Sequence, residues 1–267
     1  MVELPSFDAP PVVEMALGVQ FASVAGLRGL ELYPLWSRWR DQYPKVEEQP
    51  SLPPSTEVDQ SSGIPTVQLS LSTATPRVRY WFLSDAGSNL IQVQHDRLVV
   101  NWRRGDESGL YPRYQHMRNI FRDKATEFEN FLAETSMGKL RINQAEVSYI
   151  NAIEAPGDKI GQLDQLLRNW SNLSSHHLGE AEEARAAMIF RLPDIGQGPA
   201  RLHVGVDPAV RSDGVRVIFL TLTAQGAPRG ETLKDALDFM DAARGHVVQS
   251  FAELTSESMH TEWGRTR

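Results

Sequence analysis

The segment 10–21, PPVVEMALGVQF, alternates apolar and polar residues one by one after its two prolines. Successive side chains of a β-strand point to opposite faces, so this alternation predicts a strand with one apolar face and one more polar face. Such a strand fits an antiparallel sheet that has one face covered and the other open. The apolar face would comprise Val13, Met15, Leu17, Val19 and Phe21, and the other face Glu14, Ala16, Gly18 and Gln20.

Further strands are predicted along the chain, several of them bounded by turn residues such as SDAGSN at 84–89. His95 and Asp96 mark the turn between two of these runs, which would form a hairpin. We expect strands at 66–73, 77–85, 90–95, 97–103, 142–154, 184–193, 200–208 and 214–225.

Four other segments carry apolar residues at helical spacing. Pro34 and Pro112 fit the first turns of the first two, because proline is tolerated where the backbone N–H has no helical acceptor. The segment 44–65 contains five prolines and predicts a long extended loop, which would be either functional or disordered. The predicted helices span 27–44, 111–134, 158–170 and 231–255.

The order of one strand, one helix, several strands and a long helix occurs twice. It predicts an α+β protein of two similar β-α-β(3–4)-α halves, 1–138 and 139–267, packed as one compact unit. Each half would be a curved antiparallel sheet with helices on one face. This architecture is similar to that of the TATA-binding protein, and the similarity concerns the fold alone.

The composition limits the classes of function. Without cysteine the chain has no disulfides and no thiol nucleophiles, which fits a reducing cytoplasm. The formal net charge of −7 disfavours nucleic acid as a partner. No apolar run approaches the roughly 20 residues of a transmembrane helix, and the start MVELPSFDAPP does not read as a signal peptide. We therefore expect a cytoplasmic protein without membrane contact.

The densest group of functional side chains lies between residues 101 and 114. Guanidinium groups beside aromatic rings can bind a phosphate or a carboxylate, or stack on a base. Arg113 would lie in the first turn of a helix, where a positive charge is unfavourable unless an anion or a carboxylate neutralises it. Internal pairing that joins strand to helix is the favoured explanation of the group, and ligand contact is the alternative. Its members are Asn101, Trp102, Arg103, Arg104, Tyr111, Arg113 and Tyr114.

A second candidate is the open face of the predicted sheet. Its side chains would form a neutral polar surface that suits solvent or a protein partner better than DNA, which requires lysines and arginines. Glu14 and Glu146 have an alternative role as buried partners of arginines. The terminal Trp263 would pack either on its own domain or on a partner. The predicted interaction face comprises Glu14, Gln20, Gln68, Ser70, Gln92, Gln94 and Trp263.

Other motifs carry little chemistry. The seven histidines form neither HExxH nor a comparable ligand spacing, so we expect no metal and no cofactor. DIGQGPA, at 194–200, lacks the strand-to-helix setting of a dinucleotide-binding loop and reads as a hairpin turn. No GxSxG motif and no nucleophile–base pair is visible.

Four segments, PPVVEMALGVQF, LIQVQHDRLVVNWRR, YPRYQHMRNIF and EVSYINAIE, carry a family resemblance, together with the terminal HVVQSFAELTSESMHTEWGR. They resemble an uncharacterised, sporadically distributed bacterial family with an NWR…YPRY pairing. The resemblance covers most of the chain and implies no activity, cofactor or catalytic residue. Sporadic distribution is typical of accessory genes, including those of phage defence and toxin–antitoxin systems.

We accordingly expect a non-enzymatic binding or interaction protein with a protein partner or a homo-oligomeric state, in an accessory system of that kind. The alternative is a module that binds a small anion or a nucleotide through Arg103, Arg104 and Arg113. An enzyme whose catalytic residues are dispersed along the chain is a third reading, and it predicts a deep pocket with convergent titratable groups.

Overall fold

The computed structural model describes residues 3–53, 77–105, 111–154, 163–168, 170, 171, 177, 179, 181–193, 195–211 and 213–267. Within these residues the chain forms one antiparallel sheet with helices, so the predicted α+β class is confirmed. The strands are β1 (Val12–Phe21), β2 (Lys45–Pro50), β3 (Val78–Leu83), β4 (Asn89–Gln94), β5 (Arg97–Arg103), β6 (Ile142–Glu154), β7 (Ala186–Leu192), β8 (Ala200–Val210) and β9 (Arg216–Gly226).

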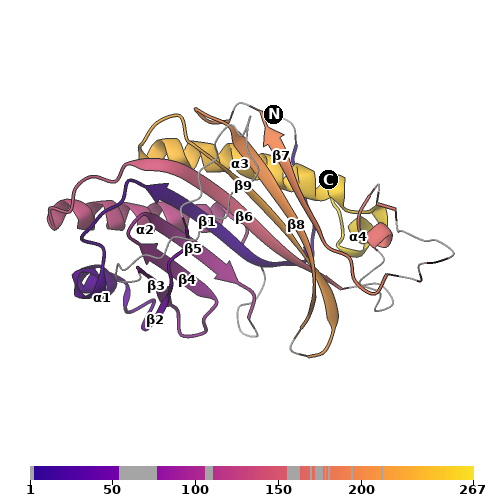
Figure 1. Cartoon of the computed structure of the whole chain (residues 1–267), viewed down its shortest axis with the longest axis horizontal. Coiled ribbons are helices and arrows are strands. Elements are labelled where there is room, and N and C mark those ends of the chain that lie inside the picture. Colours follow the sequence, from indigo (N-terminus) through magenta and orange to yellow (C-terminus); the bar gives the residue numbers. More distant parts are fainter. Residues whose placement is uncertain are drawn as a thin grey trace.

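The sheet is continuous and has nine strands in the order β2-β3-β4-β5-β1-β6-β9-β8-β7 (Figure 1). The sequence predicts one sheet for each half, so the observed sheet is larger than predicted. β1 and β6 pair at its centre, with Leu17 opposite Val147. The two halves of the chain therefore share backbone hydrogen bonds, which a separate sheet in each half would not provide.

The helices are α1 (Tyr33–Trp39), α2 (Tyr114–Glu134), α3 (Leu233–Leu254) and α4 (Glu257–Glu262), with short 3-10 turns η1 (Gly29–Leu32) and η3 (Leu163–Gln165). The long helices α2 and α3 lie on the same face of the sheet, α2 against β1 and β5 and α3 against β6 and β9 (Figure 1). Thr232 and Asp235 form a reciprocal capping box at the start of α3, which satisfies backbone N–H groups that have no helical partner.

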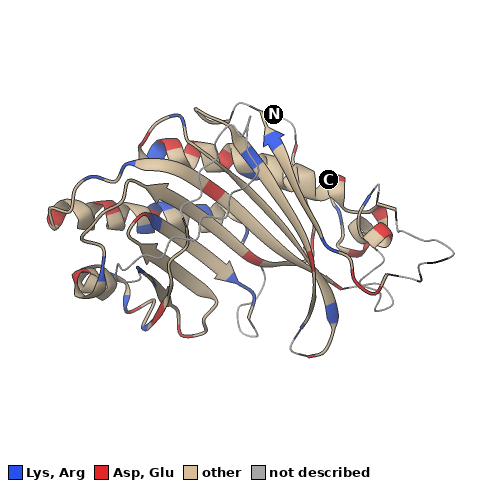
Figure 2. Cartoon of the chain, viewed as in Figure 1, with Lys and Arg blue, Asp and Glu red and all other residues tan. Residues whose placement is uncertain are grey.

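The core lies between the helices and the apolar face of the strands. Leu17, Val147 and Ala224 are fully buried on three neighbouring central strands, and Phe128 of α2 packs on Phe21 with ring centroids 5.5 Å apart. Few charged residues lie on the strands, whereas many lie on the helices and connections (Figure 2). The alternation found at 12–21 thus predicts the face of β1 that the helices cover.

Two predicted elements are wrong within the described residues. The first part of the predicted loop 44–65 forms the edge strand β2. Pro50 is tolerated there because it lies at the end of an edge strand, where its missing N–H breaks no hydrogen bond of the sheet. Of the predicted helix 158–170, the described residues 163–168 form the turn η3 and no α-helix, and Leu163 is buried there. The predicted strand 66–73 lies outside the described residues.

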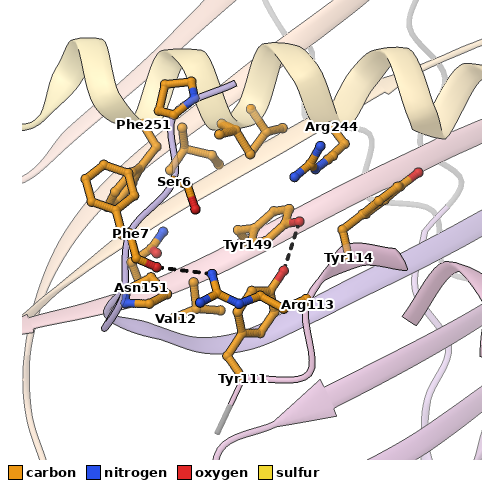
Figure 3. A pocket seen from close by; sticks show the side chains of 15 residues that line it. Ser6, Phe7, Val12, Tyr111, Arg113, Tyr114, Tyr149, Asn151, Arg244 and Phe251 are labelled. Carbon is orange, nitrogen blue, oxygen red and sulfur yellow. Dashed lines mark hydrogen bonds between the residues drawn. The ribbon is translucent and has the colours of Figure 1, made fainter. Parts of the chain in front are cut away.

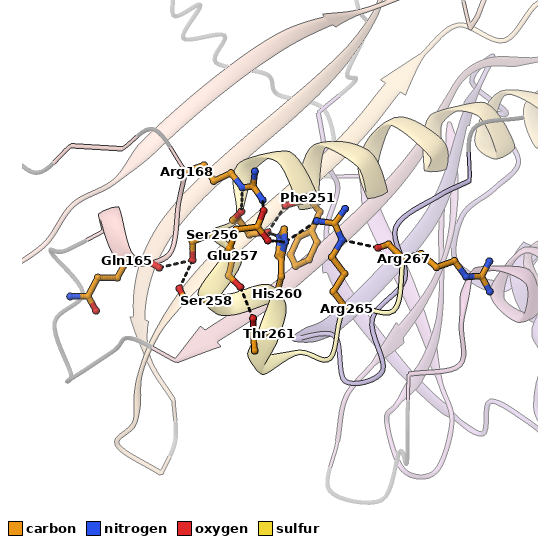
Figure 4. Close-up of polar contacts among 11 residues, drawn as sticks. Gln165, Arg168, Phe251, Ser256, Glu257, Ser258, His260, Thr261, Arg265 and Arg267 are labelled. Carbon is orange, nitrogen blue, oxygen red and sulfur yellow. Dashed lines mark hydrogen bonds and ion pairs between the residues drawn. The ribbon is translucent and has the colours of Figure 1, made fainter.

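The two ends of the chain are joined. Phe7 forms an isolated β-bridge with Arg265, and the backbone N–H of Asp8 donates to the carbonyl of Gly264. The short helix α4, which the sequence does not predict, carries the buried His260 into contact with the buried Thr255 and the exposed Arg265 (Figure 4). The segment that precedes β1 is thereby held against the helical face of the sheet.

Candidate functional site

A cavity of about 110 Å³ opens between the N-terminal segment, β6 and α3 (Figure 3). One wall is apolar, formed by side chains such as Phe7, Val247 and Phe251. We call it the Tyr–Arg cavity after its tyrosines and arginines. Its polar lining residues are Ser6, Tyr111, Arg113, Tyr114, Tyr149, Asn151 and Arg244.

Three parts of the fold bring these side chains together. Tyr149 and Asn151 lie two residues apart on β6, so both point to the face of the sheet that the helices cover. Arg244 comes from α3. It lies between Met240 and Val247, which belong to the apolar side of this helix. The segment just before α2 supplies Tyr111 and Arg113. The cavity thus exists only when the two halves of the chain are packed together.

Hydrogen bonds fix the tyrosines. Tyr111 donates its hydroxyl proton to the hydroxyl oxygen of Tyr149 at 3.1 Å (Figure 3). Because Tyr149 accepts in this hydrogen bond, its own hydroxyl proton is left to donate, and no described residue accepts it. Burial is the main cause that raises the pKa of both phenols above the ordinary value. They are therefore neutral hydrogen-bond donors at physiological pH.

Arg244 is only partly satisfied by the protein. Its guanidinium lies 5.2 Å from the ring centroid of Tyr114, and its Nε is buried without a hydrogen-bond partner among the described residues. The nearby carboxylate of Asp241 is already occupied, because it accepts from Tyr114 at 2.7 Å and from Arg118 at 2.6 and 2.7 Å. An additional hydrogen-bond acceptor beside Arg244 would satisfy the Nε–H group of its guanidinium.

Arg113 has an unusual backbone. Its φ of 67° and ψ of 155° place it in a region that is nearly restricted to glycine, which costs about 1–3 kcal/mol for other residues. Arg113 is the N-cap of α2, and its side chain donates to the carbonyl of Phe7 at 3.1 Å. The expectation that Pro112 begins the helix is therefore wrong by two residues. The start of a 21-residue helix adds positive potential beside the guanidinium.

The predicted arginine–aromatic group is divided between the two faces of the sheet. Tyr111, Arg113 and Tyr114 line the Tyr–Arg cavity, as the prediction of a ligand-contacting group requires. Trp102 is buried and its ring packs on that of Tyr111 at 5.6 Å, which joins the strand to the cavity. The members of the group that lie on the opposite face of the sheet do not line this cavity.

Arg103 and Arg104 belong to that opposite face. Arg103 pairs with Glu14 at 3.2 Å and lies 4.8 Å from the ring of Trp81. Asn101 donates to the same carboxylate of Glu14 at 2.6 Å, and Arg104 donates to the carbonyl of Pro10 at 3.3 Å. For Arg103 the structure therefore shows the internal pairing that the sequence left open.

The predicted interaction face is largely covered. Gln20, Gln92 and Gln94 have exposed fractions of 8%, 7% and 1%, so they do not form an open solvated surface. Gln92 donates to Asn101, and Gln94 exchanges two hydrogen bonds with the backbone of Leu52, at 2.9 and 3.0 Å. The chain that follows β2 thus lies over this part of the sheet. Gln68 and Ser70 lie outside the described residues.

Two further predicted residues are withdrawn from solvent, Trp263 as a buried and Glu146 as a half-buried side chain. Trp263 packs on Phe7 and Phe251, with ring centroids 6.2 and 5.2 Å away, and it is 6% exposed. It therefore docks on its own domain, which is the first of the two alternatives that the sequence offers, and it is not part of an exposed interaction face. Burial raises the pKa of Glu146, and the nearby positive charge of Arg97 opposes that rise. This supports the reading of Glu146 as an arginine partner.

Sequence reasoning missed three cavity residues, Tyr149, Asn151 and Arg244. Arg244 leaves a signal, because it occupies a position of the α3 stripe where the periodicity calls for an apolar residue. The sequence signal for Tyr149 and Asn151 is weaker. Both residues carry a polar group and lie on the apolar side of a predicted strand.

No metal site and no membrane segment is found in the described part of the chain. No group of three or more His, Asp or Glu side chains gathers there in an arrangement that could hold a metal ion. None of the described helices is both long and apolar enough to cross a membrane. Comparison with family models, with curated proteins and with solved structures gives no match to this chain.

Proposed function

We propose that the protein is a non-enzymatic binding protein for a small organic anion, which it holds in the Tyr–Arg cavity. One observation carries the proposal. Arg113 and Arg244 both line the cavity, and none of its described lining residues is Asp or Glu. Arg113 is exposed, whereas Arg244 is partly buried with an Nε that has no partner among the described residues. A partly buried guanidinium is stabilised by paired negative charge, and an anionic ligand would supply it.

The form of the cavity favours a short carboxylate. A volume of about 110 Å³ is small beside the roughly 300–1,000 Å³ of pockets for drug-sized ligands. A carboxylate accepts hydrogen bonds from guanidinium groups in a planar geometry, and the Tyr149 hydroxyl offers a further donor. The apolar wall around Phe7, Val247 and Phe251 suits a short hydrocarbon part.

Binding explains this site better than catalysis does. General acid–base catalysis needs a group whose pKa lies near the working pH. The ionisable groups among the described lining residues are guanidiniums and phenols, and burial raises the pKa of all three phenols. The hydroxyl of Ser6 has no described base beside it in the cavity lining. The cavity therefore suits recognition of an anion.

A thermal-shift series tests the proposal. Propanoate should raise the melting temperature in proportion to the logarithm of its concentration, because a ligand of the folded state stabilises by mass action. Propanamide, which has the same shape and no charge, should not. Arg244→Met should abolish the shift, whereas Arg122→Met on the exposed side of α2 should retain it. Equal shifts with propanoate and propanamide would rule out anion recognition.

A second candidate function is interaction with another copy of the protein. Ile189 and Phe190 on the edge strand β7 are 63% and 44% exposed, and an edge strand with exposed apolar side chains can pair with a further strand. The other edge, β2, carries Lys45, Glu47 and Glu48, which disfavour such pairing. Sedimentation analysis of the wild type and of Ile189→Lys checks this candidate, and a monomeric wild type would exclude it.

We further propose that the two halves, 1–138 and 139–267, are related units in the manner of the TATA-binding protein. Support comes from the mirrored order of strands outward from the β1–β6 pair, which is β5, β4 and β3 on one side and β9, β8 and β7 on the other. A role in an accessory bacterial defence or toxin–antitoxin system rests on the family resemblance. Identification of the neighbouring genes tests that role.

A further inference from the structure

The donors and acceptors of the Tyr–Arg cavity define its ligand more closely. The two guanidiniums and the Tyr149 hydroxyl offer donors, and an anion satisfies them. Asn151 differs from these groups. It is 2% exposed and lines the cavity, and its Nδ2 donates to the carbonyl of Leu220 at 3.0 Å. This bond fixes the orientation of the amide.

With Nδ2 directed at Leu220, the Oδ1 of Asn151 is the amide's acceptor. No described residue donates to it. The oxygen belongs to a residue that lines the cavity, so a ligand hydroxyl or ammonium can donate to it. The site therefore presents donors for an anionic group and one fixed acceptor for a second group of the same ligand.

The charge of the cavity decides between a hydroxyl and an ammonium. An ammonium group would add a third positive charge beside Arg113 and Arg244, and no described lining residue is Asp or Glu. A neutral hydroxyl donates to Asn151 without that repulsion. The volume of about 110 Å³ limits the enclosed part of the ligand to a few non-hydrogen atoms, since it corresponds to about four waters at about 30 Å³ each.

We propose that the ligand is a short 2-hydroxy carboxylate and that Asn151 is the residue that selects its hydroxyl group. The carboxylate would lie against Arg244 and Arg113, the hydroxyl would donate to Asn151, and the carbon chain would contact the apolar wall. This inference rests on the proposed anion-binding function and names the ligand class of the same cavity.

Calorimetric titration of the full chain with 2-hydroxypropanoate, propanoate and alanine tests the selection. The wild type should bind 2-hydroxypropanoate about three- to tenfold more tightly than propanoate, the range expected for one hydrogen bond between neutral groups. Alanine should bind more weakly than 2-hydroxypropanoate. Equal affinities for 2-hydroxypropanoate and propanoate would overturn the role of Asn151 and leave anion binding intact.

Two variants separate recognition from structural damage. Asn151→Leu should remove the preference for the hydroxyl acid while binding of propanoate persists. Asn151→Asp places a negative charge at the acceptor and should shift the preference from 2-hydroxypropanoate toward alanine. The matched controls are Asn143→Leu and Asn143→Asp, which alter an exposed asparagine of the same strand and should leave all ratios unchanged. An unaltered ratio in Asn151→Asp contradicts the inference, and failure of every carboxylate to bind contradicts the proposed function as well.

Discussion

At the scale of single residues, the Tyr–Arg cavity is built from side chains in energetically costly positions. Arg113 holds a backbone conformation nearly restricted to glycine, and Arg244 occupies an apolar stripe with its Nε unpartnered among the described residues. Asn151 is buried on the apolar side of a strand. Such positions lower stability, and they are typical of functional sites.

Replacement of Arg113 by glycine separates stability from function. Glycine adopts the backbone angles of this residue without strain, so Arg113→Gly should raise the free energy of unfolding by about 1 kcal/mol. The same change removes one guanidinium and should weaken anion binding at least tenfold. Urea denaturation and calorimetry measure the two effects. Arg113→Ala is the control, since it removes the charge and keeps the strain, and equal stability of the two variants would contradict the account.

His260 should make the stability depend on pH. Its Nε2 lies 2.8 Å from the Thr255 hydroxyl and its Nδ1 3.0 Å from Arg265, a set of contacts that fits the neutral ring (Figure 4). Burial, together with the charges of Arg265 and Arg168, lowers its pKa, and Glu257 opposes them. The unfolded chain therefore binds a proton near pH 6.5, where the folded chain does not.

The contribution of His260 is fully present above pH 6.5 and is lost as the pH falls toward the lower folded pKa. Urea midpoints should accordingly decrease between pH 7 and pH 5. The decrease should be smaller in His260→Gln and unchanged in His116→Gln, which alters an exposed histidine. Burial also lowers the pKa of His95, so a residual slope is expected in His260→Gln. If His260→Gln had the same slope as the wild type, the assignment of this pH dependence to His260 would be contradicted.

At the scale of elements, local patterns predict the strands and long helices whose sequences carry a clear alternating, apolar or helical period. β1, β4, β5, β6 and β9 follow alternating or apolar runs, and α3 begins at its capping box. The failures have physical causes. Leu163, Leu166 and Leu167 are buried at helical spacing although only η3 forms there, because burial by tertiary contacts does not require a helix. β2 is an edge strand, and its polar, proline-ended sequence resembles a loop.

The cavity could be predicted in part. The sequence places Tyr111, Arg113 and Tyr114 in one short segment, so their proximity follows from local order. Tyr149 and Arg244 join them only through the packing of β6 and α3 against the start of α2. A single sequence does not show which distant segments pack together in this way.

The capping box of α3 offers a test at this scale. Thr232→Ala removes the side-chain acceptor for the backbone N–H of Asp235 and should lower the free energy of unfolding by about 1 kcal/mol. Thr126→Ala changes the same residue type at an exposed position inside α2 and should be neutral or slightly stabilising, because alanine favours the helix. A smaller loss in Thr232→Ala than in Thr126→Ala would contradict the capping role.

At the scale of the whole molecule, the pairing of β1 with β6 holds the two halves in one sheet. Gly18 lies opposite Glu146 at this pair, and a Cβ on Gly18 would lie 2.9 Å from the Cγ of Glu146. The absence of a side chain on Gly18 thus leaves space for the Glu146 side chain near Arg97. Because the Tyr–Arg cavity draws on both halves, its geometry depends on this pair.

Gly18→Val should disturb that pair. Valine would displace Glu146 and lower the free energy of unfolding by about 1–3 kcal/mol, the usual cost of overpacking. Gly205→Val provides the control, because a Cβ there meets its nearest atom, in Asp207, at an ordinary 3.4 Å. Urea denaturation of both variants measures the difference, and equal stabilities would contradict a close fit at the centre of the sheet.

Calorimetric titration of the wild type and of Arg244→Met with 2-hydroxypropanoate is the most direct test of anion binding in the Tyr–Arg cavity. We predict saturable one-site binding to the wild type and at least a tenfold loss of affinity in Arg244→Met, since a charge-assisted hydrogen bond is removed. Arg122→Met should bind as the wild type does. No binding to the wild type, or equal binding to the wild type and Arg244→Met, would contradict the assignment of the cavity.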